Sequence, residues 1–361
     1  MLRTGVLLGA LVGVVALSVG PTGHAQSGKP WYPYAAQEHI PPFQLNGPIK
    51  NIEYTPLKKA DKEWRICVSF PHLKDPYWLA VDYGVADESK QLGVSMQLVE
   101  AGGYTNLGRQ ISEIEDCVAG GAQAVVIGAI SYTGLNQTVA RLKKQGIPVV
   151  DLVNGMSSPA IAARSAVSFK TMAEKAGEYL VKLNPQGGAT AEVAWFPGPA
   201  GAGWVVAGNE GFNDALKGST LKIVATKYGD TGKEIQLKLV EDVLAAYPNI
   251  KYIVGTAPTA EAAVQILRER GLSDKIKVIS YYFTPPVYDS IKRGQVLAAP
   301  TDSAVIQGRI AIDQAVRILE HKPYISDAGP AIYLIDKSNV NSFDMPTSLA
   351  PDGFKPIFNV G

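Results

Sequence analysis

The chain has 361 residues, enough for two domains, and 46% of them are hydrophobic while only 19% are charged, so a large core can form and general disorder is excluded. The 34 basic and 33 acidic residues give a formal net charge of +1 without a long basic run. Sequence-independent binding of nucleic acid therefore has little electrostatic support.

The first 25 residues have the pattern of a secretory signal peptide. A single charge at Arg3 precedes an apolar run over 6–19, and Gly23-His24-Ala25 forms a small-residue site. The alternative is a membrane anchor, but about 14 apolar residues are fewer than the roughly 20 that span a bilayer. We expect export, cleavage near Ala25, a periplasmic location and no membrane insertion of the cleaved chain.

Residues 26–60 are rich in proline, aromatic and turn-forming residues, which is typical of an extended leader rather than a helix. Beyond them, stretches with strand and helix spacing alternate, as in a parallel sheet with helices on both faces. The predicted strands of the first half are 65–70, 94–100, 124–128 and 147–153, and its predicted helices are 76–93, 106–119 and 135–145.

The second half repeats this rhythm. Its predicted strands are 166–169, 192–196, 222–228, 250–255, 277–282, 296–299 and 331–336, and its predicted helices are 171–183, 205–217, 233–246, 260–270, 287–293 and 305–320. We expect the last helix to pack back on the first lobe. The predicted organisation is an N-terminal lobe of 61–154 plus 303–326, a C-terminal lobe of 155–302 plus 327–345, and a tail of 346–361.

Cys67 and Cys117 are the only cysteines of the chain. Cys67 falls near the start of a predicted strand, and Cys117 near the end of a helix that leads into the next strand. Both ends share one edge of an α/β layer, so we predict a disulfide, which the periplasm permits. Two buried free thiols are the alternative. A redox role is not supported, because no Cys-x-x-Cys motif is present.

Aromatic residues gather just after the predicted strands, where parallel α/β sheets bind their ligands. In Asp75-Pro76-Tyr77-Trp78, aspartate is a favoured helix cap and proline a favoured first helical residue, so both rings fall in the first turn, facing a cleft between the lobes. The other candidates are Tyr104, Phe169, Tyr281 and Tyr282, with Tyr132 and Trp204 weaker. The alternative for each ring is ordinary core packing.

Aromatic faces attract methylated, ammonium-like groups, and a carboxylate such as Asp75 would reinforce the attraction. This combination favours a small, methyl-rich, dipolar ligand over a sugar. The alternative for Asp75 is a helix cap alone. Asp302 is expected at a crossover between the lobes. It could contact the ligand or belong to the hinge, and we favour the hinge.

Catalytic and metal-binding motifs are weak or absent in the sequence. Gly201-Ala202-Gly203 follows a predicted strand, but Val206 stands where a dinucleotide-binding loop needs its third glycine. His39, His72 and His321 are scattered and fit no metal motif. We expect no enzyme activity, no metal and no cofactor, and we place His72 in a solvated loop.

The two-lobed order resembles the periplasmic binding protein family of the ribose-binding, LacI-like type. The resemblance implies the type I fold of that family, an α/β fold in which each of two lobes is a parallel sheet flanked by helices. Three stretches, 73–79, 100–104 and 349–354, are similar to a subgroup that senses trimethylamine N-oxide together with a membrane sensor histidine kinase. That similarity implies a methylated amine as ligand and the periplasmic domain of such a kinase as partner, with the leader and the first lobe as candidate docking surface.

The resemblance also implies an aromatic box around the trimethylated nitrogen. Asp75, Tyr77, Trp78 and Tyr104 match its first-lobe half, Tyr282 matches an aromatic of the second lobe, and Phe169 stands where the subgroup has a tryptophan. Lys170 beside it is unexpected: it donates to an N-oxide oxygen or points to solvent. The alternative function is a substrate-binding protein that feeds a sugar or another small solute to an ABC importer.

Overall fold

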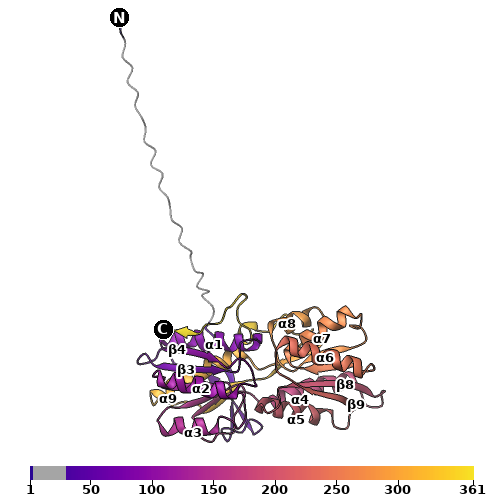
Figure 1. Ribbon diagram of the computed structural model, residues 1–361, viewed down its shortest axis with the longest axis horizontal. Coiled ribbons are helices and arrows are strands. Elements are labelled where there is room, and N and C mark those ends of the chain that lie inside the picture. The colour runs from indigo at the N-terminus through magenta and orange to yellow at the C-terminus, as the bar shows by residue number, and fades with distance from the viewer. Residues whose placement is uncertain (3–29) are drawn as a thin grey trace. The chain divides into compact units, whose positions relative to one another are not determined.

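Two mainly parallel sheets organise the chain from Tyr32 onward, and each is covered by helices (Figure 1). The computed structural model describes residues 1, 2 and 30–361, so residues 3–25 of the predicted signal peptide and its cleavage site lie outside the described residues. No helix in this described part is both long and apolar enough to cross a bilayer.

The first sheet has nine strands in the order β15-β4-β3-β5-β6-β7-β13-β1-β2, and β4 through β13 in that order run parallel. Its helices are α1, α2, α3 and α9, and together they form the first lobe. The strands are β1 (Tyr34–His39), β2 (Ile49–Tyr54), β3 (Arg65–Phe70), β4 (Ser95–Glu100), β5 (Ala124–Ile127), β6 (Val149–Leu152), β7 (Ala163–Ser165), β13 (Asp327–Pro330) and β15 (Asn359–Val360); the helices are α1 (Pro76–Leu92), α2 (Leu107–Ala119), α3 (Asn136–Lys144) and α9 (Ala304–Leu319).

The second sheet has four parallel strands in the order β11-β10-β8-β9. Helix α4 packs against α5, and α6 packs against α7, to complete the second lobe. Its strands are β8 (Ala191–Gly198), β9 (Leu221–Tyr228), β10 (Tyr252–Gly255) and β11 (Lys277–Ser280). Its helices are α4 (Phe169–Leu183), α5 (Gly203–Leu216), α6 (Lys233–Ala246), α7 (Ala257–Glu269) and α8 (Pro285–Lys292). A separate two-stranded sheet pairs β12 (Ala298–Thr301) with β14 (Tyr333–Asp336).

Alternation along β3 explains why helices cover both faces of the first sheet. Ile66 and Val68 join the core that contains α1 and α9, whereas Cys67 joins the core formed with α2 and α3. Strand residues point alternately to opposite faces, so a strand that is apolar at every position is buried on both. Helices α1 and α9 cross closely at Gly84. A Cβ on this glycine would stand 2.2 Å from the Val305 carbonyl oxygen, so the crossing leaves no room for a side chain there.

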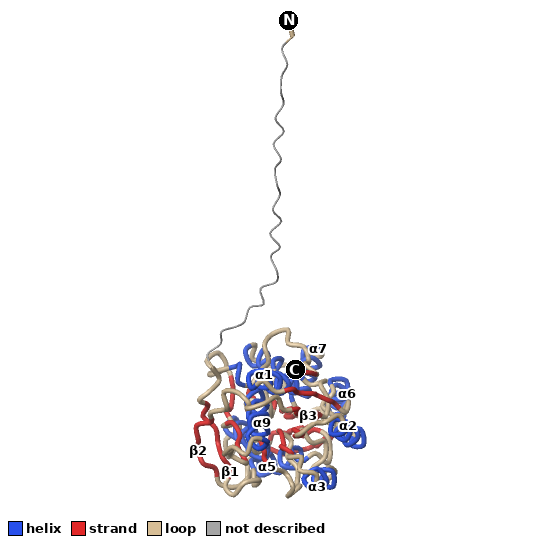
Figure 2. The backbone as a smooth tube through the Cα atoms, turned by 90° about the vertical axis from the view of Figure 1, so that its left-hand side faces the viewer, coloured by secondary structure: helices blue, strands red, loops and turns tan. Residues whose placement is uncertain are grey.

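The leader contains a β-hairpin that we did not predict. Strands β1 and β2 pair with each other (Figure 2), and β1 also pairs with β13. Residues 327–330, which we placed in the second lobe, therefore extend the first sheet between β7 and β1. The partner of β1 lies near the other end of the chain, and no local pattern reveals such a pairing. The predicted strand 166–169 was also misplaced: β7 ends at Ser165, and Ser168 caps α4 by accepting a hydrogen bond from the Thr171 N–H.

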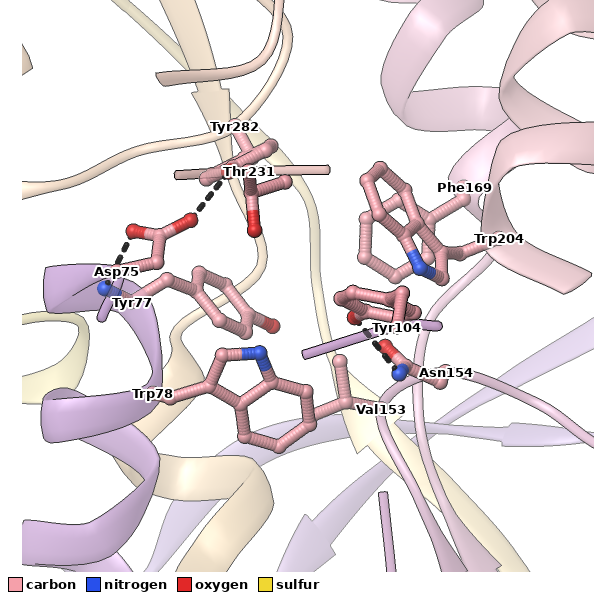
Figure 3. Close-up of a pocket in the computed structure, with 10 residues that line it drawn as sticks. All are labelled: Asp75, Tyr77, Trp78, Tyr104, Val153, Asn154, Phe169, Trp204, Thr231 and Tyr282. Carbon is pink, nitrogen blue, oxygen red and sulfur yellow. Dashed lines mark hydrogen bonds between the residues drawn. The ribbon is translucent and has the colours of Figure 1, made fainter. Parts of the chain in front are cut away.

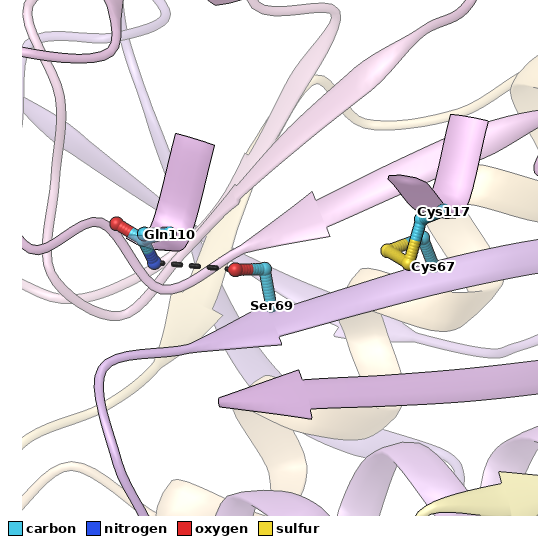
Figure 4. Close-up of a disulfide and its surroundings, with 4 residues drawn as sticks. All are labelled: Cys67, Ser69, Gln110 and Cys117. Carbon is cyan, nitrogen blue, oxygen red and sulfur yellow. Dashed lines mark hydrogen bonds between the residues drawn. A yellow bond between two sulfur atoms is a disulfide. The ribbon is translucent and has the colours of Figure 1, made fainter. Parts of the chain in front are cut away.

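Cys67 and Cys117 form the predicted disulfide, with their Cα atoms 6.0 Å apart (Figure 4). Both cysteines are buried at the edge where β3 begins and α2 ends.

Loss of this disulfide should lower stability. The bond closes a loop of 50 residues, for which the chain-entropy model gives about 4 kcal/mol. We expect the double variant Cys67→Ala/Cys117→Ala to lose about that free energy of unfolding in urea titrations. The wild-type protein under reducing conditions should match the variant, and equal stability of reduced and oxidised protein would contradict the prediction.

Candidate ligand-binding site

A small pocket lies where the carboxyl ends of the strands of both sheets meet (Figure 3). The lining residues come from both lobes: Asp75, Tyr77, Trp78, Tyr104, Val153 and Asn154 from the first, and Phe169, Trp204, Thr231 and Tyr282 from the second.

The start of α1 places three of these side chains. Asp75 caps the helix, and its Oδ1 accepts a hydrogen bond of 3.0 Å from the Tyr77 N–H. Pro76 occupies the first helical position, as predicted, so Tyr77 and Trp78 lie in the first turn. The other carboxylate oxygen of Asp75 accepts a hydrogen bond from the Tyr282 hydroxyl, which belongs to the second lobe. The cap residue is therefore also a bridge between the lobes.

Asp75 is the charged group of the pocket, and only 2% of it is exposed. Burial raises the pKa of its carboxyl to about 6, against the opposing effect of the hydrogen bonds from Tyr282 and Tyr77. A cation brought into the pocket would remove much of this cost, because an opposite charge favours the ionised carboxylate. The pocket therefore favours a ligand with a positive centre.

Six aromatic rings line the space beside Asp75, and each lies next to at least one other (Figure 3). Tyr77 meets Trp78 with ring centroids 5.8 Å apart and Tyr282 at 5.4 Å. Trp204 meets Tyr282 at 6.3 Å, Phe169 at 5.6 Å and Tyr104 at 6.0 Å. Ring faces and edges thus enclose the pocket from both lobes, a surface that suits methyl groups on a cationic nitrogen.

The hydroxyl of Tyr104 is a donor that the pocket leaves available. Its oxygen accepts a hydrogen bond of 3.0 Å from the Asn154 side-chain amide, whose other N–H donates to the Ala129 carbonyl oxygen. Among the described residues, no acceptor takes the Tyr104 hydroxyl proton. The Trp204 ring lies beside this hydroxyl group, with the ring centroids of Tyr104 and Trp204 6.0 Å apart. A ligand oxygen could accept from the Tyr104 hydroxyl.

The structure brings seven sequence-predicted residues to the pocket: Asp75, Tyr77, Trp78, Tyr104, Phe169, Tyr282 and, from the weaker candidates, Trp204. Asp302 stays outside the pocket lining and accepts a hydrogen bond of 2.5 Å from the Tyr77 hydroxyl, so it supports a lining ring from behind. Tyr132 is 46% exposed and lines an adjoining outer cavity beside the leader loop, which shares Asn154, Phe169 and Trp204 with the pocket.

Two other candidates are excluded from the pocket by their partners. Lys170 points away, and its ammonium binds Glu210 at 2.5 Å and Asp214 at 2.7 Å on α5. Tyr281 is fully buried, donates its hydroxyl proton to the Pro197 carbonyl oxygen and stacks behind Trp204. Helix and sheet packing that is not visible in the local sequence decides both positions.

Val153, Asn154 and Thr231 line the pocket although the residue types alone did not select them. Each directly or closely follows a strand, which is the signal that could have found them. His72 corrects another expectation: it is fully buried instead of solvated. Burial lowers the pKa of its imidazole to about 4, against the opposing effect of Asp230.

Both pocket tryptophans pack on a glycine at a strand end. A Cβ on Gly128, just after β5, would lie 2.4 Å from the Trp78 ring, and one on Gly198 would lie 2.5 Å from the Trp204 ring. The Gln110 side chain holds this region, since its amide donates to the Gly128 carbonyl oxygen and to the Ser69 hydroxyl (Figure 4). The indole positions therefore depend on residues that carry no side chain.

We expect Gly128→Ala to weaken ligand binding about tenfold. The added methyl cannot fit against the Trp78 ring, and overpacking of this kind costs about 1–3 kcal/mol. Calorimetric titration of the variant checks this. Gly108→Ala in α2 is the control, because a Cβ there meets nothing within 4 Å. Tight binding retained by Gly128→Ala would show that the indole position is not critical.

The model of the periplasmic binding protein domain matches residues 66–323. The chain belongs to the periplasmic binding protein family. The expected type I fold is thereby confirmed, and the family name agrees with the expectation of a binding protein rather than an enzyme.

Individual relatives place this periplasmic binding protein near TorT, as the sequence resemblance predicted. It is 36% identical over 306 residues to the periplasmic protein TorT of Escherichia coli K12, covering 84% of this chain and 86% of the relative. Its structure matches TorT in a complex with the TorS sensor domain in the presence of trimethylamine N-oxide, at 34% identity and a TM-score of 0.74, covering 82% of this chain and all of that one.

A second kind of relative is a solute-binding protein of an ABC transporter from Bradyrhizobium sp. BTAi1, solved with bound bis-tris. It is 59% identical, with a TM-score of 0.79, and the match covers 92% of this chain and all of that one. Both kinds of relative share the fold of this chain.

Proposed function

We propose that this protein binds trimethylamine N-oxide or a similar methylated amine in the periplasm, closes on it, and modulates a TorS-like membrane sensor histidine kinase. The observation that carries the proposal is a single buried carboxylate, Asp75, inside a ring of six aromatic side chains. The TorT relatives, one of them in complex with the TorS sensor domain, support the same function.

The two ends of an N-oxide have different partners in this pocket. The methylated nitrogen carries the positive charge and suits the ring faces and the Asp75 carboxylate. The oxygen carries the negative charge and suits the Tyr104 hydroxyl, which accepts from Asn154 and can donate its own proton. A sugar would instead need several polar side chains around its hydroxyls, and this lining is mostly aromatic.

Closure of the lobes would carry the signal. Hydrogen bonds already cross between the lobes from Tyr282 to Asp75, and from the Tyr104 N–H to Asp230 at 3.3 Å. A ligand that contacts both lobes stabilises this closed arrangement by its greater affinity for it. The kinase domain, docked on the leader and the first lobe, would then respond to the difference between the open and closed surfaces.

The second candidate function is solute capture for an ABC importer. The 59% identical relative is described as an ABC transporter solute-binding protein, and its bound bis-tris is an amine with hydroxylated arms. The cationic end of such an amine would also suit the aromatic pocket. The two candidates differ in the partner of the closed protein more than in the pocket.

Calorimetric titration with trimethylamine N-oxide, betaine, choline and ribose tests the ligand class. We expect heat of binding with the N-oxide and none with ribose; ribose binding without a response to the N-oxide would overturn the proposal. Co-elution of the loaded protein with the periplasmic domain of a kinase encoded nearby supports sensing. Loss of uptake of labelled ligand in a deletion strain supports import.

Export with cleavage near Ala25 is part of the proposal. The charge at Arg3, the apolar run and the small-residue site support it. Mass spectrometry of the protein from a periplasmic extract should show a chain that begins at or near Gln26. A chain that retains Met1 in the membrane fraction would contradict it.

A further inference from the structure

The orientation of one hydroxyl in the pocket follows from a chain of hydrogen bonds that begins at a backbone amide. The Lys74 N–H donates to Nδ1 of His72 at 3.2 Å. A backbone N–H can only donate, so Nδ1 is an acceptor and carries no proton. A neutral imidazole then has its proton on Nε2. The complete burial of His72 disfavours the doubly protonated, charged ring.

The second nitrogen of His72 faces Thr231 across the gap between the lobes. Nε2 lies 2.9 Å from the Thr231 hydroxyl oxygen and 3.7 Å from a carboxylate oxygen of Asp230. The nearby carboxylate favours a proton at Nε2, in agreement with the assignment from Lys74. His72 follows β3 in the first lobe, whereas Thr231 follows β9 in the second. The His72 N–H therefore donates to Thr231 only when the lobes are together.

The hydroxyl proton of Thr231 must then point away from His72. Thr231 is 3% exposed and lines the pocket, where its oxygen faces the space between the aromatic rings (Figure 3). Among the described residues, no acceptor takes this proton. A buried donor without an acceptor has a free-energy cost that a ligand acceptor atom can remove.

We propose that Thr231 is the donor by which the closed pocket selects ligands that carry an acceptor oxygen beside the methylated nitrogen, and that His72 is the residue that positions this donor. The inference rests on the proposed methylated-amine ligand and adds a specificity determinant to it. Tyr104 from the first lobe and Thr231 from the second would donate to the same oxygen. Recognition of the oxygen is thereby linked to closure, whereas the aromatic rings and Asp75 recognise the cation.

Two probes of similar shape separate these contributions: trimethylamine N-oxide and tetramethylammonium, which replaces the oxygen by a methyl group. In Thr231→Val, which keeps the shape and removes the hydroxyl, we expect the ratio of N-oxide affinity to tetramethylammonium affinity to fall about tenfold or more, since hydrogen bonds to charged groups are strong. Thr231→Ser keeps the hydroxyl and should retain most of the ratio. Thermal unfolding of each variant confirms that it is folded.

A readout that needs no ligand tests the positioning by His72. Nitrogen-15 NMR of the imidazole should show the Nε2–H form in the wild-type protein at neutral pH; the Nδ1–H form would overturn the positioning role.

The binding data distinguish failure of this inference from failure of the proposed function. If the wild-type protein binds the N-oxide and Thr231→Val lowers affinity for both probes equally, only the selectivity role of Thr231 is overturned. Binding of neither probe by the wild-type protein overturns the proposed ligand class and this inference with it.

Discussion

Replacement of Trp78 by alanine is expected to weaken the binding of trimethylamine N-oxide by at least tenfold. Trp78 is 2% exposed, lies in the first turn of α1 and forms one wall of the pocket. Tryptophan is the strongest cation–π partner among the side chains, and such a contact contributes about 2 kcal/mol or more when desolvated. Calorimetric titration of wild type and variant with the same N-oxide stock measures the difference.

The controls separate loss of the ring from loss of stability. Truncation of a buried tryptophan costs about 3–5 kcal/mol of folding free energy, so thermal unfolding must show that the variant is folded at the titration temperature. Trp64→Ala is the matched variant, because Trp64 is also buried but lies outside the pocket, with its indole N–H bound to Glu320. Unchanged affinity in Trp78→Ala would remove this ring from the site.

Replacement of Asp75 by asparagine is expected to have the second large effect, and the effect depends on pH. In the ligand-free protein, burial raises the pKa of the Asp75 carboxyl to about 6 from 3.8. The folded state therefore prefers the protonated form. This contribution to stability is complete below about pH 4 and is lost as the pH rises through about 6, a loss of about 3 kcal/mol. Asp75→Asn should consequently raise the unliganded melting temperature at pH 8 and leave it nearly unchanged at pH 4.

Ligand binding should respond in the opposite sense, because a bound cation requires the carboxylate. We expect wild-type affinity for tetramethylammonium, whose charge does not vary with pH, to increase from pH 5 to pH 7.5. Asp75→Asn should lower affinity about tenfold or more at pH 7.5. It should keep only a smaller pH dependence, which comes from His72, because His72 must be neutral to be buried in the closed form. Equal pH profiles in wild type and variant would contradict this assignment.

Local sequence rules were sufficient for the first-lobe half of the site. An aspartate cap, a proline at the first helical position and two following aromatics define one helical turn, and the structure has that turn where it was predicted. The disulfide followed equally from the ends of a strand and a helix at one edge of a layer. These predictions depend on neighbours within a few residues or on the regular alternation of strands and helices, both of which the sequence displays directly.

The assembly of the site depended on approaches between distant segments. Trp204, a weaker candidate in the sequence, enters the pocket, while two carboxylates draw Lys170 to α5. His72 is buried where Thr231 of the second lobe meets it, and the leader hairpin joins the first sheet through the pairing of β1 with β13.

The sequence by itself determined the alternating α/β elements, the first turn of α1 and the chemical character of the residues that follow the strands. Only the tertiary structure decided which of those residues share a pocket, which protons remain available to a ligand, and which charges are neutralised elsewhere. The physical reason is that helix capping and strand alternation arise from adjacent residues, whereas burial and hydrogen-bond partnership arise from the packing of two lobes against each other.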